Sequence, residues 1–175
     1  MIVVFTGNGK GKTTATLGQM MRAVGQGKRV IMFQFIKGPW ISGEHKFLDK
    51  YSKFKKAFEI RRGGKGFVGI LGDKLPFSVH KKAAKETLKK AALAIQSKKW
   101  DIVALDEVNV AVTLKLLRVA EVLRVIRREP QHMIVVLSGR GAPASFIKRA
   151  DLATEMKELK HPFTKGKKAL VGFEF

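Results

Sequence analysis

Short runs of apolar residues recur along the chain, and they have the length of buried strands. Some of them are apolar at every position, which is typical of parallel strands that helices cover on both faces. Val, Ile and Phe are common in these runs, as they are in strands generally. The predicted strands cover residues 2–5, 29–35, 58–60, 101–107, 132–137 and 169–175.

Between these runs, apolar residues recur every three or four positions, the spacing of a helix with one buried face. The clearest helix covers residues 79–97, where lysines occupy the polar face. In the helix predicted at 14–25, Met20 and Met21 are expected in the core. Further helices are predicted at 44–51, 116–126 and 144–148. Strands that alternate with helices predict an α/β fold with a mostly parallel sheet flanked by helices.

A glycine-rich loop joins the first predicted strand to the first predicted helix. Its sequence is Thr6-Gly7-Asn8-Gly9-Lys10-Gly11-Lys12-Thr13-Thr14. Glycines let backbone amides approach a ligand closely, and these amides form an anion site together with the helix N-terminus. The Lys12 ammonium adds positive charge for phosphates, and the Thr13 hydroxyl suits Mg²⁺. The order of strand, loop and helix therefore predicts a phosphate-binding loop.

The loop departs from the general phosphate-loop spacing. The usual pattern is Gly, four residues and then Gly-Lys-Thr, but Thr6 stands where the first glycine belongs, and counting from Gly7 leaves the loop one residue short. A tight turn that binds no ligand is the alternative interpretation. The flanking strand and helix favour the phosphate-binding interpretation, and with it a RecA-like P-loop nucleotide-binding fold.

Two carboxylates, Asp106 and Glu107, close the apolar run that begins at residue 101. In a parallel sheet the carboxyl ends of the strands meet at one edge, where ligands bind. One carboxylate there can bind Mg²⁺ or its water, and the other can orient the first or act as a base. The alternative is a helix start capped by Asp106. The phosphate-binding loop upstream favours the metal interpretation.

Two further segments expected at this edge carry candidate ligand contacts. Residues 61–73 are rich in glycine, and Phe67 stands among them with little apolar company. Phe67 therefore either tucks into the core or contacts a ligand. Arg140 lies in a glycine turn after the strand predicted at 132–137. It either reaches a phosphate or carboxylate with its forked donors or simply lies at the surface.

The composition is that of one globular domain over residues 1–175, with 45% hydrophobic residues. We expect no membrane span, because no stretch approaches roughly 20 apolar residues, and no signal peptide, because the chain starts with a strand. The absence of cysteine excludes disulfides and Cys-ligated zinc and agrees with a cytoplasmic location. The four histidines show no helical metal-binding spacing.

The formal net charge of +21 is the unusual feature of the composition, and it attracts polyanions such as nucleic acid. Proteins that bind single strands interleave basic residues with stacking aromatics, whereas this chain has two Trp and one Tyr. We therefore expect the lysines mainly on solvated faces. The residues alone predict an α/β domain that binds a nucleoside triphosphate with Mg²⁺. Hydrolysis, phosphoryl transfer and another displacement on the nucleotide all stay open.

Further motifs stand along nearly the whole chain. They are Arg22-Ala23-Val24-Gly25, Gln34-Phe35-Ile36-Lys37-Gly38, Gly43-Glu44, Gly66-Phe67, Leu105-Asp106-Glu107, Ser138-Gly139-Arg140-Gly141 and Lys160-His161-Pro162-Phe163. Together with the glycine loop, they resemble the motifs of the phosphate-loop corrinoid adenosyltransferases, the ATP:cob(I)alamin family of cobalamin biosynthesis. The shortened glycine loop is the form that this family uses.

The resemblance implies that cobalt(I) of a reduced corrinoid attacks the 5′ carbon of ATP and that triphosphate leaves. It implies ATP and Mg²⁺ (or Mn²⁺) as cofactors and the corrinoid as co-substrate. Lys12, Thr13 and Glu107 are then catalytic, and Thr13, Asp106 and Glu107 are the metal ligands. No general base is required, because the cobalt is the nucleophile. The residues expected to bind the nucleotide are Gly7, Asn8, Gly9, Lys10, Gly11, Lys12, Thr13, Thr14, Arg22 and Arg140.

The resemblance also implies that Phe67 contacts the corrinoid. Apolar side chains beneath the corrin ring favour loss of the lower ligand, which makes cobalt(I) accessible by reduction. The family usually has Trp two residues after this Phe, where the present chain has Gly69, and Ile70 or Leu71 is a candidate to replace it. A homodimer and an electron-donating reductase are implied as partners. Neither a membrane nor nucleic acid is expected, and the alternative function is a P-loop ATPase that acts on or binds nucleic acid.

Overall fold

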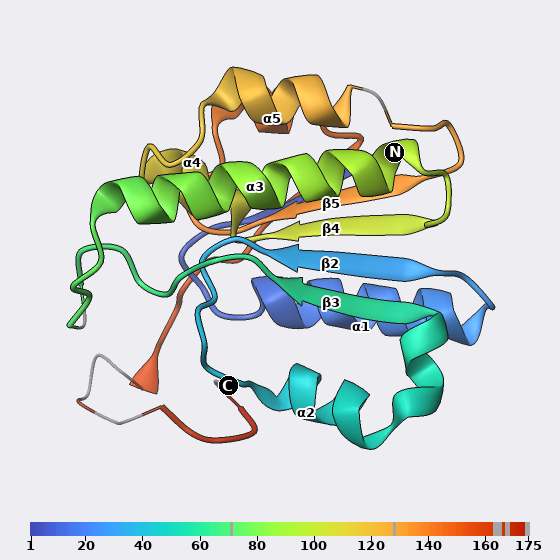
Figure 1. Cartoon of the computed structure of the whole chain (residues 1–175), viewed down its shortest axis with the longest axis horizontal. Helices are drawn as coiled ribbons and strands as arrows, with labels where there is room; N and C mark the ends of the chain where they lie inside the picture. The colour runs from blue at the N-terminus through green and yellow to red at the C-terminus, as the bar shows by residue number, and fades with distance from the viewer. Residues whose placement is uncertain (71, 128, 163–165, 167–168, 174–175) are drawn as a thin grey trace.

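The chain folds around a six-stranded sheet in which every strand is parallel to its neighbours (Figure 1). The computed structural model describes residues 1–175 except 71, 128, 163–165, 167–168 and 174–175. The strand order is β3-β2-β4-β5-β1-β6. The strands are β1 (Ile2–Thr6), β2 (Val30–Gln34), β3 (Phe58–Arg62), β4 (Ile102–Asp106), β5 (Ile134–Ser138) and β6 (Leu152–Glu155). The α/β fold with a parallel sheet that the sequence predicts is confirmed.

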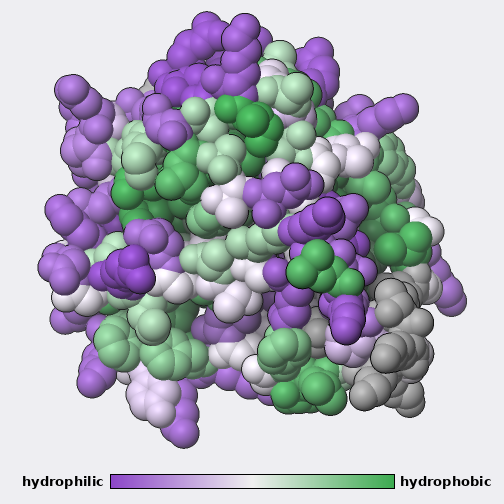
Figure 2. Space-filling view, turned by 180° about the vertical axis from the view of Figure 1, so that it is seen from behind, coloured by the Kyte–Doolittle hydropathy of each residue, from purple (hydrophilic) through white to green (hydrophobic). Residues whose placement is uncertain are grey.

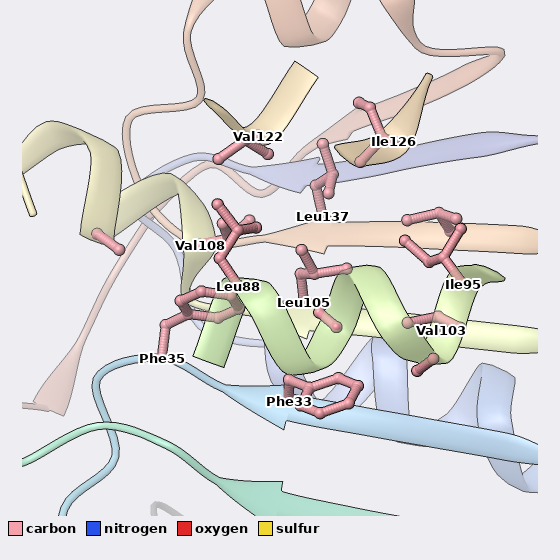
Figure 3. Packing of buried hydrophobic residues seen from close by; sticks show 14 of the residues in the cluster. Phe33, Phe35, Leu88, Ile95, Val103, Leu105, Val108, Val122, Ile126 and Leu137 are labelled. Atoms are coloured by element: carbon pink, nitrogen blue, oxygen red, sulfur yellow. The ribbon is translucent and has the colours of Figure 1, made fainter. Parts of the chain in front are cut away.

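Helices cover both faces of this sheet (Figure 1). They are α1 (Lys12–Gly25), α2 (Gly43–Lys50), α3 (Phe77–Gln96), α4 (Val108–Thr113), α5 (Val119–Ile126) and α6 (Ala144–Arg149), with a 3-10 turn at Ser52–Lys56. On one face, Phe33, Leu105 and Leu137 of the strands are buried together with Leu88 and Ile95 of α3 (Figure 3). This larger cluster fixes α3 and α5 over the sheet.

The opposite face of the sheet packs against α1 and α2. Met32, Ala104 and Val136 are buried there with Met20 of α1. They alternate along the strands with the residues of the first cluster, as the two-residue period of a strand requires. Met21, which was expected in the core, is exposed. Consecutive helical residues point about 100° apart, and here Met20 is the one that faces the sheet.

The predictions for the C-terminal part of the chain differ most from the structure. The strand expected at 169–175 is wrong for residues 169–173, which form turn and irregular structure. The last strand is instead β6, which lies at the edge of the sheet beside β1 and is exposed throughout. Its apolar pattern is weak because neither face is buried. Helix α4 was also not expected, and Leu71 and Phe163 lie outside the described residues.

Because the strands are parallel, their carboxyl ends all lie at one edge of the sheet. The register pairs Gln34 of β2 with Asp106 of β4, and Phe5 of β1 with Ser138 of β5. Strand β5 therefore lies between β1, which leads into the glycine loop, and β4, which ends in the carboxylates. This order brings the loop and the acids to the same region, which is where ligands bind in parallel sheets.

Hydrophilic residues dominate much of the surface. On the face seen from behind, Figure 2 shows hydrophilic side chains around the rim, with apolar residues gathered between them. In the part of the chain that the structure describes, no helix combines the length and the apolar character that a bilayer crossing requires.

Candidate active site

The glycine loop folds around the ammonium group of Lys12. Lys12 Nζ donates hydrogen bonds to the carbonyl oxygens of Gly7 (2.7 Å) and Gly9 (2.6 Å). Burial is the main influence on the pKa of Lys12 and lowers it, while the negative charge of Glu107 opposes this effect. Because an ammonium group has three donors, Lys12 can bind the loop and still offer an N–H to a phosphate.

The segment that follows β6 packs directly on the loop. A Cβ atom at Gly9 would lie 2.8 Å from the carbonyl of Lys157, and one at Gly7 would lie 2.8 Å from the amide nitrogen of Met156. Larger residues therefore do not fit at either position without a backbone shift. The Gly9 N–H donates to the Met156 carbonyl oxygen (2.7 Å). In this conformation the Gly9 amide is engaged within the chain, so a phosphate depends on other amides of the loop and of α1.

The N-terminus of α1 is open to an anion. The helix begins at Lys12 after Gly11, whose φ of 118° favours glycine and which has no side chain to cap the helix. The first turn, which contains Thr13 and Thr14, has no acidic residue. The first amides of the helix, which have no partner within it, and the positive end of the helix dipole therefore face the place where the glycine loop is expected to bind phosphates.

Asp106 is the buried centre of the site. Its Oδ1 atom accepts hydrogen bonds from Thr13 Oγ1 (3.0 Å) and from Ser138 Oγ (2.6 Å). The cap of α4 is Glu107, with φ of 61°, so the alternative in which Asp106 caps a helix is wrong. The Glu107 N–H donates to Ser138 Oγ (3.3 Å). The loop hydroxyl and the β4 carboxylate are thus adjacent, as the metal interpretation requires.

The environment of the two carboxylates disfavours their charged forms. Burial raises the pKa of Asp106, although hydrogen bonds from Ser138 and Thr13 oppose it. Burial also raises the pKa of Glu107, to about 7, and the nearby Asp106 carboxylate adds to the effect while Lys12 opposes it. A divalent cation would favour the charged forms. Hydroxyl and carboxylate oxygens are the donors that Mg²⁺ prefers, so these residues fit Mg²⁺ or Mn²⁺.

The described residues contain no group of three His, Cys, Asp or Glu side chains that could hold a metal. The two carboxylates are therefore too few to form a closed protein site. A magnesium ion here would need the Thr13 hydroxyl, water and the phosphates of the nucleotide, which is the usual way in which proteins bind Mg²⁺.

Arg140 lies close enough to the loop to act on its charges. It stands between Gly139 and Gly141, which both have positive φ, and its side chain is exposed. Its positive charge contributes to the lowered pKa of Lys12 and opposes the raised pKa of Glu107. This position agrees with a phosphate contact. The exposure of the side chain agrees equally with the alternative in which Arg140 simply lies at the surface.

The nucleotide site was also expected to include Asn8 and Lys10 of the loop and Arg22 of α1. Asn8 is exposed within the loop. Lys10 is also exposed, and its ammonium lies 4.7 Å from the centre of the Phe173 ring. Arg22 lies in the last turn of α1, about 15 Å along the helix from Lys12 at 1.5 Å per residue. The structure does not bring Arg22 to the loop of the same chain.

Phe67 lies on the loop after β3 and is 43% exposed. The alternative in which it tucks into the core is therefore wrong. Its ring centroid lies 5.5 Å from that of Trp40, on the loop after β2. An exposed aromatic pair at the ligand-binding edge is suited to an apolar ligand.

Comparison with known proteins identifies the family. The family model "ATP:corrinoid adenosyltransferase BtuR/CobO/CobP" matches residues 1–175. The chain belongs to the corrinoid adenosyltransferases. The family resemblance of the motifs is thereby confirmed, and with it the transfer of an adenosyl group from ATP to a corrinoid.

Individual adenosyltransferases match over the full length of the chain. The corrinoid adenosyltransferase of Sinorhizobium sp. is 38% identical over 176 residues, which cover 100% of this chain and 80% of that protein. The corrinoid adenosyltransferase of Escherichia coli (strain K12) is 34% identical over 175 residues, covering 100% of this chain and 85% of that protein. The Pseudomonas aeruginosa enzyme of the same name is 36% identical, with 100% and 83% covered.

A solved structure shares the fold of this adenosyltransferase. The flagellar accessory protein FlaH from Methanocaldococcus jannaschii superposes with a TM-score of 0.57 at 11% identity, covering 88% of this chain and 69% of that one. At this identity the likeness concerns the fold alone. It agrees with the P-loop nucleotide-binding fold that the sequence predicts.

A partly buried polar network in this adenosyltransferase was not predicted. Ser42 N–H donates to His45 Nδ1 (3.2 Å), and the other ring nitrogen therefore donates to Gln34 Oε1 (2.9 Å). Gln34 Nε2 and Lys37 Nζ both donate to Glu44 Oε1, at 3.1 Å and 2.8 Å. The sequence feature that could have indicated this network is the polar residue Gln34 at the end of the apolar strand β2. The network fixes the loop after β2 beside Asp106, the register neighbour of Gln34.

Proposed function

We propose that this chain transfers the 5′-deoxyadenosyl group of ATP to cobalt(I) of a reduced corrinoid and releases triphosphate, with residues 1–175 acting as one domain. The observation that carries the proposal is the 3.0 Å contact between Thr13 and Asp106 beside the Lys12 ammonium. This arrangement suits a polyphosphate with its metal. The same edge of the sheet offers the exposed ring of Phe67 to the flat face of a second substrate.

The reaction is a displacement at the 5′ carbon of ATP. The electron pair of cobalt(I) forms the Co–C bond while the C5′–O bond breaks, and the electrons of that bond leave on the triphosphate oxygen. Cobalt ends formally as cobalt(III). Lys12, Arg140 and the first amides of α1 stabilise the negative charge that the leaving group gains. Because the nucleophile carries no proton, no side chain has to act as a base.

Thr13, Asp106 and Glu107 would hold a magnesium or manganese ion. The bound ion supplies positive charge that stabilises the leaving triphosphate. Ser138 acts as a positioning residue, because its hydroxyl orients Asp106 and accepts the amide N–H of Glu107. Partners of this kind fix the direction of metal-binding side chains.

Phe67 presents an apolar ring to the corrinoid. Water and the lower base lose hydrogen bonds when they approach such a surface, so the ring favours a corrinoid without a lower ligand. That state is the one from which cobalt(I) is accessible. A homodimeric assembly and an electron-donating reductase belong to the same proposal, and their support is the family resemblance.

An anaerobic assay tests the proposal. ATP, Mg²⁺ and a chemically reduced corrinoid should give a light-sensitive adenosylated corrinoid and one triphosphate for each product. Lys12→Ala should lower kcat by about 10²- to 10³-fold, the range for loss of a donor that stabilises transition-state charge. The control is Lys28→Ala, because Lys28 pairs with Asp101 before β4, away from the carboxyl edge. Release of diphosphate and phosphate in place of triphosphate would overturn the mechanism.

The charge motivates the alternative of an ATPase that binds nucleic acid. A hollow of about 620 Å³ is lined by Arg29, Lys55, Lys56, Glu59, Arg61, Lys90, Leu93, Ala94, Ser97, Lys99 and Trp100. Trp100 is buried, and the Arg29 guanidinium lies 5.2 Å from its ring centre. The indole therefore offers no open face for base stacking. ATP hydrolysis that rises when polynucleotides are added would favour this alternative.

A further inference from the structure

An exposed pair of aromatic rings borders a hollow of about 190 Å³. The rings are Trp40 and Phe67, whose centroids are 5.5 Å apart with an interplanar angle of 40°. Trp40 is 55% exposed, and Ile70, which also lines the hollow, is 58% exposed. Large apolar side chains that stay exposed side by side mark a binding surface.

Gly69 contributes no aromatic ring to this hollow. Gly69 has φ of 69°, and no described heavy atom lies within 4 Å of the place where its Cβ would be. The side of the hollow next to Phe67 is therefore bounded by Trp40 and Ile70. Trp40 comes from a different loop, 27 residues earlier than Phe67 in the chain.

Backbone contacts between the two loops fix the position of Trp40. The Gly66 N–H donates to the carbonyl oxygen of Ile36 (3.0 Å). A Cβ at Gly38 would lie 2.7 Å from the Gly66 nitrogen, and a Cβ at Gly66 would lie 3.0 Å from the Trp40 ring. The loops after β2 and β3 are thus packed backbone to backbone, and the indole covers their contact.

The loop that carries Trp40 also reaches the nucleotide site. Lys37 donates to Glu44 (2.8 Å), and its positive charge opposes the raised pKa of Asp106 and Glu107. A ligand seated on Trp40 therefore lies on the same edge of the sheet as the carboxylates. The two substrates of an adenosyl transfer have to meet at such a place.

The rim of the hollow is polar and partly fixed. Lys65 and Lys74 line it with Asp73. Asp73 accepts hydrogen bonds from the Gly69 amide (2.8 Å) and the Leu75 amide (3.1 Å), and its Oδ2 lies 2.9 Å from His80 Nε2. The carboxylate thus holds the loop that carries Ile70, whereas the two ammonium groups can bind acceptors of a ligand.

We propose that Trp40 contacts the lower axial face of the corrinoid and, with Phe67, excludes the lower ligand from cobalt. This inference rests on the proposed transfer to cobalt(I). Trp40, Phe67 and Ile70 present an apolar surface to a flat macrocycle, while water or a base would lose hydrogen bonds there. Lys65 and Lys74 match the amide and phosphate oxygens at the periphery of a complete corrinoid.

Kinetics test the contact with three variants, Trp40→Ala, Trp40→Phe and Phe47→Ala. Phe47 is the matched control, because it is 42% exposed and packs on Tyr51 but does not line the hollow. With chemically reduced cobalt(I) corrinoid, Trp40→Ala should raise the corrinoid KM by about tenfold or more, as for a buried aromatic anchor. Trp40→Phe should keep most of the affinity, and Phe47→Ala should match the wild type. The affinity for ATP, measured without corrinoid, should stay unchanged in all three.

Electron paramagnetic resonance of the bound cobalt(II) corrinoid provides a second readout that needs no adenosyl transfer. With ATP present, the wild type should hold a fraction of the cobalt(II) without its lower ligand. Trp40→Ala should lose this fraction, and Trp40→Phe should retain it. A wild-type KM together with a wild-type spectrum in Trp40→Ala would overturn the proposal. A wild type that makes no adenosylated corrinoid would instead refute the proposed function, while the spectra still decide the role of Trp40.

Discussion

Replacing Glu44 by Gln removes one negative charge from the partly buried polar network around Gln34 and keeps the size of the side chain. The Glu44 side chain is 15% exposed, and Lys37 Nζ lies 2.8 Å from its Oε1 atom. Burial alone would raise the pKa of Glu44. Hydrogen bonds from Lys37, from Ser42 and from the amide of Glu44 outweigh burial and lower the pKa from 4.5 to about 2.

The stability that this carboxylate contributes follows from the two pKa values. Because the folded pKa is the lower one, the contribution is fully present above pH 4.5 and is lost as the pH falls toward 2. At about 1.36 kcal/mol for each pKa unit, the difference corresponds to about 3 kcal/mol at pH 7. The same linkage gives a contribution smaller by less than about 1 kcal/mol at pH 4 and one of about 1 kcal/mol at pH 3.

Urea unfolding of the wild type and Glu44→Gln at pH 7, 4 and 3 measures this contribution. Asp49→Asn is the matched control, because Asp49 Oδ1 lies 2.9 Å from Lys55 Nζ but its side chain is 71% exposed. Exposed pairs contribute about 0.2–1 kcal/mol, so the control should lose far less stability. A Glu44→Gln effect that stays constant from pH 7 to pH 3, or that is no larger than that of Asp49→Asn, would refute the reasoning.

Two further predictions concern glycine positions and the candidate metal site. Gly64→Ala should destabilise the fold by about 1–3 kcal/mol, because its Cβ would lie 2.5 Å from the carbonyl oxygen of Ile36. Gly18→Ala in α1 should stabilise the fold by about 0.5–1 kcal/mol, since no described heavy atom outside its own helix lies within 4 Å of the place where its Cβ would be. Thermal unfolding compares the two variants, and effects of the same sign would contradict the argument. Ser138→Ala should weaken ATP binding about 10- to 100-fold in Mg²⁺ and much less in EDTA, as titration calorimetry can show. Equal losses in both buffers would contradict a role for Ser138 through the metal.

The meeting of the glycine loop with the two carboxylates could be predicted from the sequence, because the signals for each segment are local. The glycines, Lys12 and Thr13 are contiguous, and an apolar run before them and an amphipathic pattern after them fix the strand and the helix. Asp106 and Glu107 likewise follow directly from a buried strand. The parallel sheet then brings the two segments to one edge, as the register of β1, β4 and β5 shows.

Contacts between distant segments could not be predicted in the same way. Ser138 stood in a recognised motif, but its bond to Asp106 depends on β5 lying beside β4. The engagement of the Gly9 amide depends on the exposed strand β6, whose sequence carries little apolar signal. Arg22 was placed with the nucleotide by resemblance, yet the length of α1 separates it from Lys12 within this chain.

The hollow beside Phe67 shows a further limit of comparing sequences position by position. Such a comparison counts Gly69 as the loss of an aromatic ring, because a motif records only its own positions. In the folded chain, Gly38 and Gly66 allow two loops to touch through their backbones, and this contact sets Trp40 5.5 Å from Phe67. What matters for a ligand is where an aromatic ring lies in the folded chain. A residue of a second loop, here Trp40, can therefore provide the ring that position 69 lacks. The glycines that permit the close contact therefore carry as much information about the apolar surface as its aromatic residues do.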